Sequence, residues 1–147
     1  MEDCKEAATP TAMNFLMDAD EVGQQVDSTK YRGLIGSLLY QIASRPYIQF
    51  SVCLCARFQS NPKESYFKAA KRILNYLKGK TNVGLWYPSD SNIVLSGFSN
   101  SDYAGCKLDS KSTNGTCHLL ESTLISWNSK TQVCATLFIA EAEYIVA

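Results

Sequence analysis

The chain has 147 residues, of which 46% are hydrophobic and 19% are charged, a composition typical of a folded globular protein rather than a disordered one. Its 14 basic and 14 acidic residues give a net charge of zero, although the two kinds are unevenly distributed. No stretch approaches the roughly 18–20 apolar residues of a membrane span, so we exclude a transmembrane helix.

The charges divide the chain into three parts. Residues 1–27 hold seven acids and one Lys, residues 28–80 hold ten bases and one acid, and residues 81–147 hold six acids and three Lys. The first part has no sustained periodicity and no recognisable signal peptide, so we interpret it as an acidic linker. The basic middle either contacts phosphates or is a solvated surface.

Apolar residues at helical spacing predict three helices in the middle part. The first starts at Ser28, with Ser28 or Asp27 as its cap, and its apolar face is formed by Tyr31, Leu34, Ile35, Leu38, Leu39 and Ile42. Pro46 suits the first turn of a second helix, which is apolar almost all round over 47–58. Asn61 is the predicted cap of a third helix that ends at Gly79.

The third helix has two unlike sides. One is apolar and needs a partner, which the first two helices supply. The other is basic and carries Lys68, Lys71, Arg72 and Lys78. This basic side either binds a nucleic-acid backbone or simply faces solvent.

After Gly84 the period changes to two, which predicts strands. We expect one strand over 93–103, a hairpin turn over 109–115, and strands over 116–120 and 123–127. Residues 135–147 return to helical spacing. The predicted fold class is therefore α+β, with a three-helix unit followed by an antiparallel sheet and one helix.

Cysteine and histidine are placed unfavourably for a structural metal site. The six Cys include no Cys-x-x-Cys pair, and His118 is the only His. A zinc site needs four ligands at close spacing, so we expect none. The even number of cysteines permits disulfides if the chain is exported, while the favoured interpretation is free buried thiols.

Several motifs, in order and at matching spacing, resemble the C-terminal region of copia-type retrotransposon Pol polyproteins. They are YRGLIGSLLY at 31–40, SRP at 44–46, RFQSNP at 57–62, AAKRILNYLKG at 69–79, GLWYP at 84–88, SDYAGC at 101–106, KSTNG at 111–115 and AEAEY at 140–144. The resemblance implies three segments: the linker at 1–27, a reverse-transcriptase-derived helical unit at 28–83, and a truncated ribonuclease H-like domain with an incomplete sheet at 84–147.

The ribonuclease H reaction of that family requires carboxylates that hold two Mg²⁺ ions. The resemblance places the first metal-binding Asp of the family at Asn100 and the helical Glu at Glu143. Asp102 lies on the same strand face as Asn100 but about 7 Å along the strand. Glu141 lies on roughly the opposite side of its helix from Glu143. We therefore expect no bound metal, no cofactor and no enzymatic activity.

Three functions remain for a chain that acts by binding. One is an inactive retrotransposon remnant, and another is residual binding of RNA or DNA through the basic side. The third follows from Arg72-Ile73-Leu74-Asn75, which resembles the Arg-x-Leu-Arg motif of secreted oomycete effectors. Short copia-derived chains like this one also resemble proteins classed with that effector group. That resemblance implies a virulence protein that enters plant host cells, binds host proteins and suppresses defence cell death.

Two further expectations concern location and assembly. As an effector the chain would be secreted and act in the host cell, and otherwise it would be cytoplasmic. The open edge of the predicted sheet favours self-association. Ribonuclease H activity within a larger Pol polyprotein is the alternative in which Mg²⁺ would be required.

Overall fold

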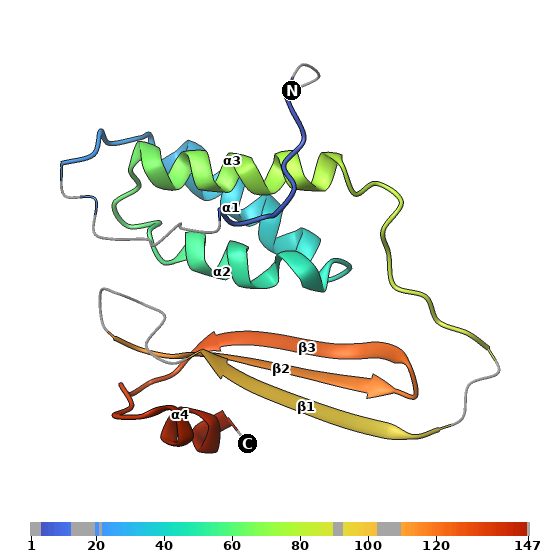
Figure 1. The fold of residues 1–147 in the computed structure, drawn as a ribbon. Helices are drawn as coiled ribbons and strands as arrows, with labels where there is room; N and C mark the ends of the chain where they lie inside the picture. The colour runs from blue at the N-terminus through green and yellow to red at the C-terminus, as the bar shows by residue number, and fades with distance from the viewer. Residues whose placement is uncertain (1–3, 13–19, 21, 90–92, 103–109, 147) are drawn as a thin grey trace. The chain divides into compact units, whose positions relative to one another are not determined.

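The computed structural model describes residues 4–12, 20, 22–89, 93–102 and 110–146. The chain divides into two compact units, Met1–Gly84 and Leu85–Ala147. The first contains three α-helices, and the second contains a three-stranded antiparallel sheet followed by a fourth helix (Figure 1). The predicted α+β class is confirmed, while the ribonuclease H-like identity of the sheet stays a prediction.

Helix α1 spans Ser28–Ile42 and begins where a side chain can cap it. The Asp27 carboxylate accepts hydrogen bonds from the backbone N–H groups of Thr29 and Lys30, so Asp27, one of the two predicted residues, is the cap. The helix buries Tyr31, Ile35 and Leu38. Their spacing of three and four residues places them on one face, as the sequence predicts.

A short 3₁₀ turn, Pro46–Ile48, leads into helix α2 at Gln49–Ala56. Pro46 lies at the start of this turn, where its missing N–H costs nothing. Val52 and Cys55 are buried against α1 and α3, whereas Phe50 is exposed. The other residues of the helix are buried or half-buried, which agrees with a sequence that is apolar almost all round.

Helix α3 spans Glu64–Lys78 and begins later than the predicted cap, Asn61. The Asn61 side chain instead accepts a hydrogen bond from Gln25. Residues 24–26 pair with residues 62–64 through backbone hydrogen bonds of 3.0 Å and 2.9 Å. This pairing keeps Lys63 extended and delays the helix until Glu64. The predicted end at Gly79 is confirmed.

The first unit has one hydrophobic core, to which all three helices contribute. Its fully or almost fully buried residues are Tyr31, Ile35, Leu38, Ile48, Val52, Cys55, Tyr66, Ala70 and Ile73. The Phe58 and Tyr66 rings stack with centroids 4.0 Å apart. The amphipathic pattern of the third helix is therefore satisfied by the first two, as expected.

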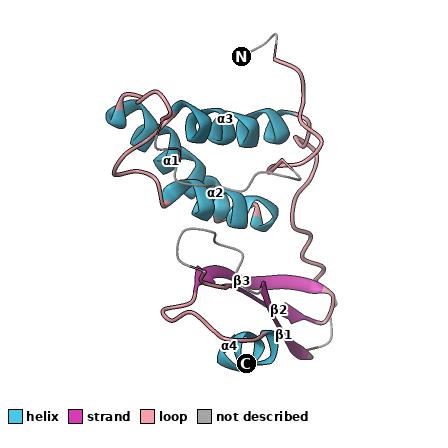
Figure 2. Cartoon of the chain, turned by 60° about the vertical axis from the view of Figure 1, so that its left-hand side comes forward, coloured by secondary structure: helices cyan, strands magenta, loops and turns pink. Residues whose placement is uncertain are grey.

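The second unit holds strands β1 (Leu95–Asp102), β2 (Thr113–Leu120) and β3 (Thr123–Thr131) in the order β1-β2-β3 (Figure 2). The predicted hairpin turn over 109–115 is wrong at its end, because residues 113–115 belong to β2 and pair with both neighbouring strands. Residues 103–109 lie outside the described part of the chain. The second and third strands are also longer than predicted, because polar residues pair along the ladder as well as apolar ones.

Helix α4, Ile139–Val146, begins four residues after the predicted start. The Glu141 carboxylate accepts a 2.8 Å hydrogen bond from the Leu137 N–H and so satisfies a group that precedes the first turn. Ala142 is the buried residue of this helix. Within the described residues, no helix has both the length and the apolar composition that crossing a membrane requires.

Candidate functional site

Asn100, where the sequence resemblance placed a metal-binding Asp, lies exposed on β1. Its neighbour Ser101 is only 9% exposed. Gln132 donates from Nε2 both to Ser101 Oγ, at 3.4 Å, and to the Ala142 carbonyl on α4, at 2.8 Å. Ser101 therefore faces α4. Because side chains alternate along a strand, Asn100 and Asp102 lie on the opposite face of the sheet.

Asp102 has a hydrogen-bond partner of its own. One of its carboxylate oxygens accepts from the backbone N–H of Thr113, the residue paired with it at the start of β2. The side chain is exposed and closes the end of the β1–β2 ladder. This is the geometry of a surface acid beside a chain connection rather than that of a metal ligand.

Glu143 is exposed on α4, beside the buried Ala142. The structure therefore does not bring Glu143 together with Asn100 and Asp102, since α4 packs on the other face of β1. Across the described residues, no three His, Cys, Asp or Glu side chains converge as metal ligands would.

The basic side of α3 is the other predicted site, and two of its cations point outward. Lys68 lies 4.0 Å from Glu64, one turn earlier, and its side chain is 73% exposed. The Lys71 ammonium lies 4.2 Å above the centre of the Phe67 ring. Such exposed contacts contribute little to stability, so both ammonium groups remain accessible to an anionic partner.

Arg72 and Lys78, the other two cations, contact the N-terminal segment of the chain. The Arg72 guanidinium donates to the Thr9 carbonyl and to Thr9 Oγ1, both at 3.1 Å. Lys78 donates to the Cys4 carbonyl at 3.2 Å. Residues 4–12, which we call the N-terminal strap, thus run along α3 (Figure 1). The sequence predicts only a linker there.

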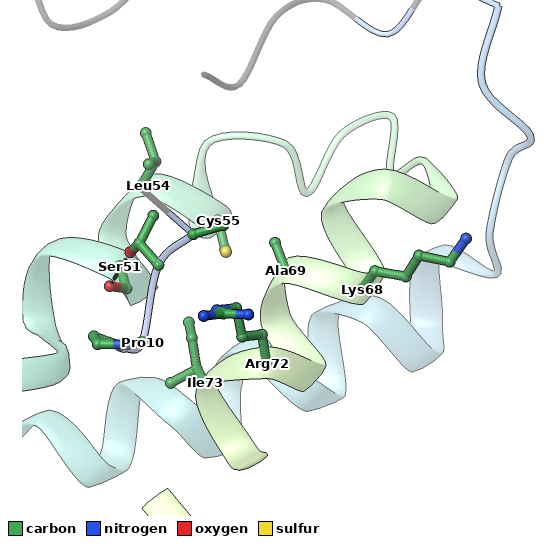
Figure 3. Close-up of a pocket in the computed structure, with 10 residues that line it drawn as sticks. Pro10, Ser51, Leu54, Cys55, Lys68, Ala69, Arg72 and Ile73 are labelled. Atoms are coloured by element: carbon green, nitrogen blue, oxygen red, sulfur yellow. Dashed lines mark hydrogen bonds between the residues drawn. The ribbon is translucent and has the colours of Figure 1, made fainter. Parts of the chain in front are cut away.

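A cavity of about 260 Å³ lies between the strap and helices α2 and α3. Its lining includes Pro10, Leu54, Cys55, Ala69, Arg72 and Ile73 (Figure 3). At its edge the hydroxyl groups of Thr11 and Ser51 hydrogen-bond to each other. Strap contacts of this kind join residues far apart in sequence and leave no periodic signal that could have revealed them.

The effector-like tetrapeptide, residues 72–75, lies within α3. Ile73 is 1% exposed and belongs to the core, and Leu74 is half-buried. The Asn75 carbonyl accepts a 3.4 Å hydrogen bond from the Ala7 N–H of the strap. In the folded chain these residues are therefore structural and do not form an accessible linear motif.

Among the known proteins with similar sequences are Pol polyproteins of copia-type retrotransposons. The chain is 37% identical over 140 residues to the Retrovirus-related Pol polyprotein from transposon RE1 of Arabidopsis thaliana, covering 95% of this chain and 10% of the polyprotein. It is 34% identical to that from transposon TNT 1-94 of Nicotiana tabacum, covering 100% of this chain and 12% of the polyprotein.

A short relative is Secreted RxLR effector protein 161 of Plasmopara viticola. It is 31% identical over 116 residues, which are 78% of this chain and 82% of that protein. No protein-family model and no solved structure matches the chain. These similarities define a protein related to copia-type Pol. The chain belongs to that family, and it spans about a tenth of the length of the polyproteins it matches.

Proposed function

We propose that this chain is a non-catalytic, copia Pol-related protein that acts by binding, in the role of a secreted effector inside plant host cells. The observation that carries the proposal is the similarity to Secreted RxLR effector protein 161, of which the chain covers 82%. The named role of that protein is to be a secreted effector, and we transfer this role to the present chain as a hypothesis.

The positions of the ribonuclease H-related residues support a role without catalysis. Two-metal hydrolysis needs carboxylates that converge within the reach of ions about 3.5–4 Å apart. Asn100 supplies no negative charge, and the carboxylate of Asp102 is bonded to the backbone of Thr113. Glu143 lies on α4, across the sheet from both.

A ribonuclease H assay on an RNA–DNA hybrid with Mg²⁺ tests the non-catalytic part. We expect no cleavage by the wild type, by Asn100→Asp or by Glu143→Ala. Cleavage by the wild type that Glu143→Ala abolishes would contradict the proposal and would assign the reaction to this chain.

Host-protein binding would use the folded surface of the chain, because Ile73 is buried and the tetrapeptide is part of a helix. The chain is expressed in plant leaves, and the leaves are then treated with an elicitor of defence cell death. We expect suppression by the wild type and by Asn75→Ala, and none by Ile35→Asp, which disrupts the core. The effector role fails if the wild type and Ile35→Asp give equal cell death.

Nucleic-acid binding is the second candidate, and the exposed ammonium groups of Lys68 and Lys71 favour it. Phosphate contacts release counterions, so affinity should fall steeply with salt. Fluorescence anisotropy with an RNA–DNA hybrid measures the binding constant at several salt concentrations. Replacing Lys68 and Lys71 with Gln should reduce the slope of log binding constant against log salt concentration by about two. The Lys130→Gln variant on β3 is the matched control. Equal slopes for all variants would exclude this interface.

A further inference from the structure

Thr9 combines three features at one point of the N-terminal strap. Its side chain is exposed, its Oγ1 accepts a 3.1 Å hydrogen bond from the Arg72 guanidinium, and Pro10 follows it. The same hydroxyl donates a 2.6 Å hydrogen bond to the Thr11 carbonyl. A hydroxyl that is accessible to an enzyme therefore already lies against a permanent cation.

We propose that Thr9 is a phosphorylation site and that Arg72 binds the phosphate placed there. The donor is a nucleoside triphosphate, and the catalyst is a protein kinase that selects proline after its acceptor residue. Thr9 Oγ forms a bond to the γ-phosphorus while the bond from that phosphorus to the β–γ bridging oxygen breaks. The nucleoside diphosphate leaves with the electron pair, and the hydroxyl proton passes to the base of the kinase.

Pro10 determines which class of kinase fits. Proline has no backbone N–H and holds its φ near −65°, so the strap after Thr9 offers neither a donor nor an α-helical turn to the enzyme. It also biases Thr9 itself toward extended backbone, the conformation in which a peptide lies in an enzyme cleft. Thr11, two residues on, is half-buried and hydrogen-bonded to Ser51, and it is followed by Ala12.

Arg72 suits a phosphate better than it suits the present hydroxyl. A phosphothreonine carries nearly two negative charges and three strong acceptor oxygens. The planar guanidinium can donate to two of these at once, and such charge-assisted bonds are shorter and stronger than neutral ones. The adjoining cavity, which Arg72 lines, leaves space beside the guanidinium. The bond from Thr9 to the Thr11 carbonyl is lost, because phosphorylation removes the hydroxyl proton.

The charges along the strap favour this placement of a dianion. Lys78 contacts its first described residue, Cys4, and Arg72 contacts Thr9. Glu6, the acid between them, lies beside Gly79 at the far end of α3. Phosphorylation would therefore strengthen the contact between the strap and α3, with the Arg72 guanidinium bound to the phosphate.

The first test uses the full-length chain, a proline-directed protein kinase and ATP, with mass spectrometry to locate the phosphate. We expect phosphate on Thr9 in the wild type and in Thr11→Val, none at this site in Thr9→Val, and at least about tenfold slower labelling in Pro10→Ala. Absence of phosphate from Thr9, or equal labelling of Thr9 in Pro10→Ala, overturns the site.

The second test asks whether Arg72 binds the phosphate. In the wild type we expect phosphorylation to raise Tm by about 2–4 °C, because the phosphate bound to Arg72 stabilises the folded chain. We also expect a phosphatase to remove the phosphate from Thr9 about tenfold more slowly, because the phosphate must first leave Arg72. Both effects should vanish in phosphorylated Arg72→Gln. They should shrink in Arg72→Lys, which keeps the positive charge but lacks the planar guanidinium that can donate two hydrogen bonds at once. If Arg72→Gln does not fold, Arg72→Lys decides. Effects as large as in the wild type overturn the role of Arg72.

Discussion

The hydroxyl of Tyr31 donates a 2.8 Å hydrogen bond to the backbone carbonyl of Cys55 and so joins α1 to the last turn of α2. Both residues are almost completely inaccessible to solvent. The same carbonyl also accepts from the Phe58 N–H at 3.2 Å, where the helix ends. A buried polar group is thus satisfied at the centre of an otherwise apolar core.

Replacing Tyr31 with Phe removes the donor but keeps the ring. We expect the free energy of unfolding to fall by about 1 kcal/mol, because the Cys55 carbonyl keeps its bond to Phe58. Urea denaturation followed by far-UV circular dichroism measures the change. Tyr40→Phe, at a tyrosine that is 82% exposed, is the matched control and should be neutral. Equal stability of the two variants would show that the Tyr31 bond has no net value.

The same two residues predict how stability depends on pH. Burial raises the pKa of the Cys55 thiol from 9.0 to about 12, and burial likewise raises the pKa of Tyr31. The folded chain therefore holds these protons at a pH where the unfolded chain has released them. The contribution of Cys55 is complete below pH 9.0 and is lost as pH rises toward about 12, whereas the loss of the Tyr31 contribution begins at pH 10.0.

We expect the free energy of unfolding to fall above pH 9.0 for Cys55 and above pH 10.0 for Tyr31, at a rate of up to about 1.4 kcal/mol per pH unit for each group. Denaturation series across the alkaline range measure this slope. Cys55→Ala should make it shallower, whatever its effect on stability at neutral pH. A slope that is identical in the variant would mean that Cys55 ionises equally in the folded and unfolded chain.

Local patterns were sufficient to predict that the first unit contains three helices, although not all of their bounds. The spacing of Tyr31, Ile35 and Leu38 and the cap at Asp27 are both contained within one helix, so no tertiary information is needed. The start of α3 was missed because it depends on residues 24–26, which pair with residues 62–64. A contact across so many residues leaves no trace in local periodicity.

The candidate sites were predictable only in part, for the same reason. Strand alternation correctly places Asn100 and Asp102 on a common face. It cannot tell which face α4 covers, since that is decided by Gln132 and by the buried Ala142. Helical spacing places Lys68, Lys71, Arg72 and Lys78 on one side of the helix. It cannot show that Arg72 and Lys78 donate hydrogen bonds to the N-terminal strap.

Gln132, which is 4% exposed, should control the docking of α4. Its amide donates to Asn114 Oδ1 at 2.6 Å and to the Ala142 carbonyl at 2.8 Å. In Gln132→Ala we expect a loss of about 2 kcal/mol and faster hydrogen exchange of the α4 amides, because these acceptors and Ser101 Oγ lose their buried partner. Asn128→Ala, at an exposed position of β3, should change neither. Unchanged exchange in Gln132→Ala would mean that other contacts hold α4.

The sheet edges make the second unit the expected site of self-association. In the described part of the sheet, β1 and β3 each have a neighbour on one side only, and Phe98 and Ile125 expose apolar side chains on these strands. Unpaired backbone groups beside apolar side chains promote pairing with another chain. Sedimentation velocity should therefore show mass increasing with concentration.

A charge on an edge strand opposes such pairing, so Ile125→Lys or Phe98→Lys should shift association to higher concentration, depending on which edge is used. Ile125→Thr, which keeps a β-branched side chain without a charge, controls for the loss of apolar surface. If Ile125→Lys alone is monomeric, β3 is the pairing edge, and if Phe98→Lys alone is monomeric, β1 is. A wild type that stays monomeric at every concentration would contradict the prediction. The backbone groups at the edges of β1 and β3 would then be hydrated rather than paired with another chain.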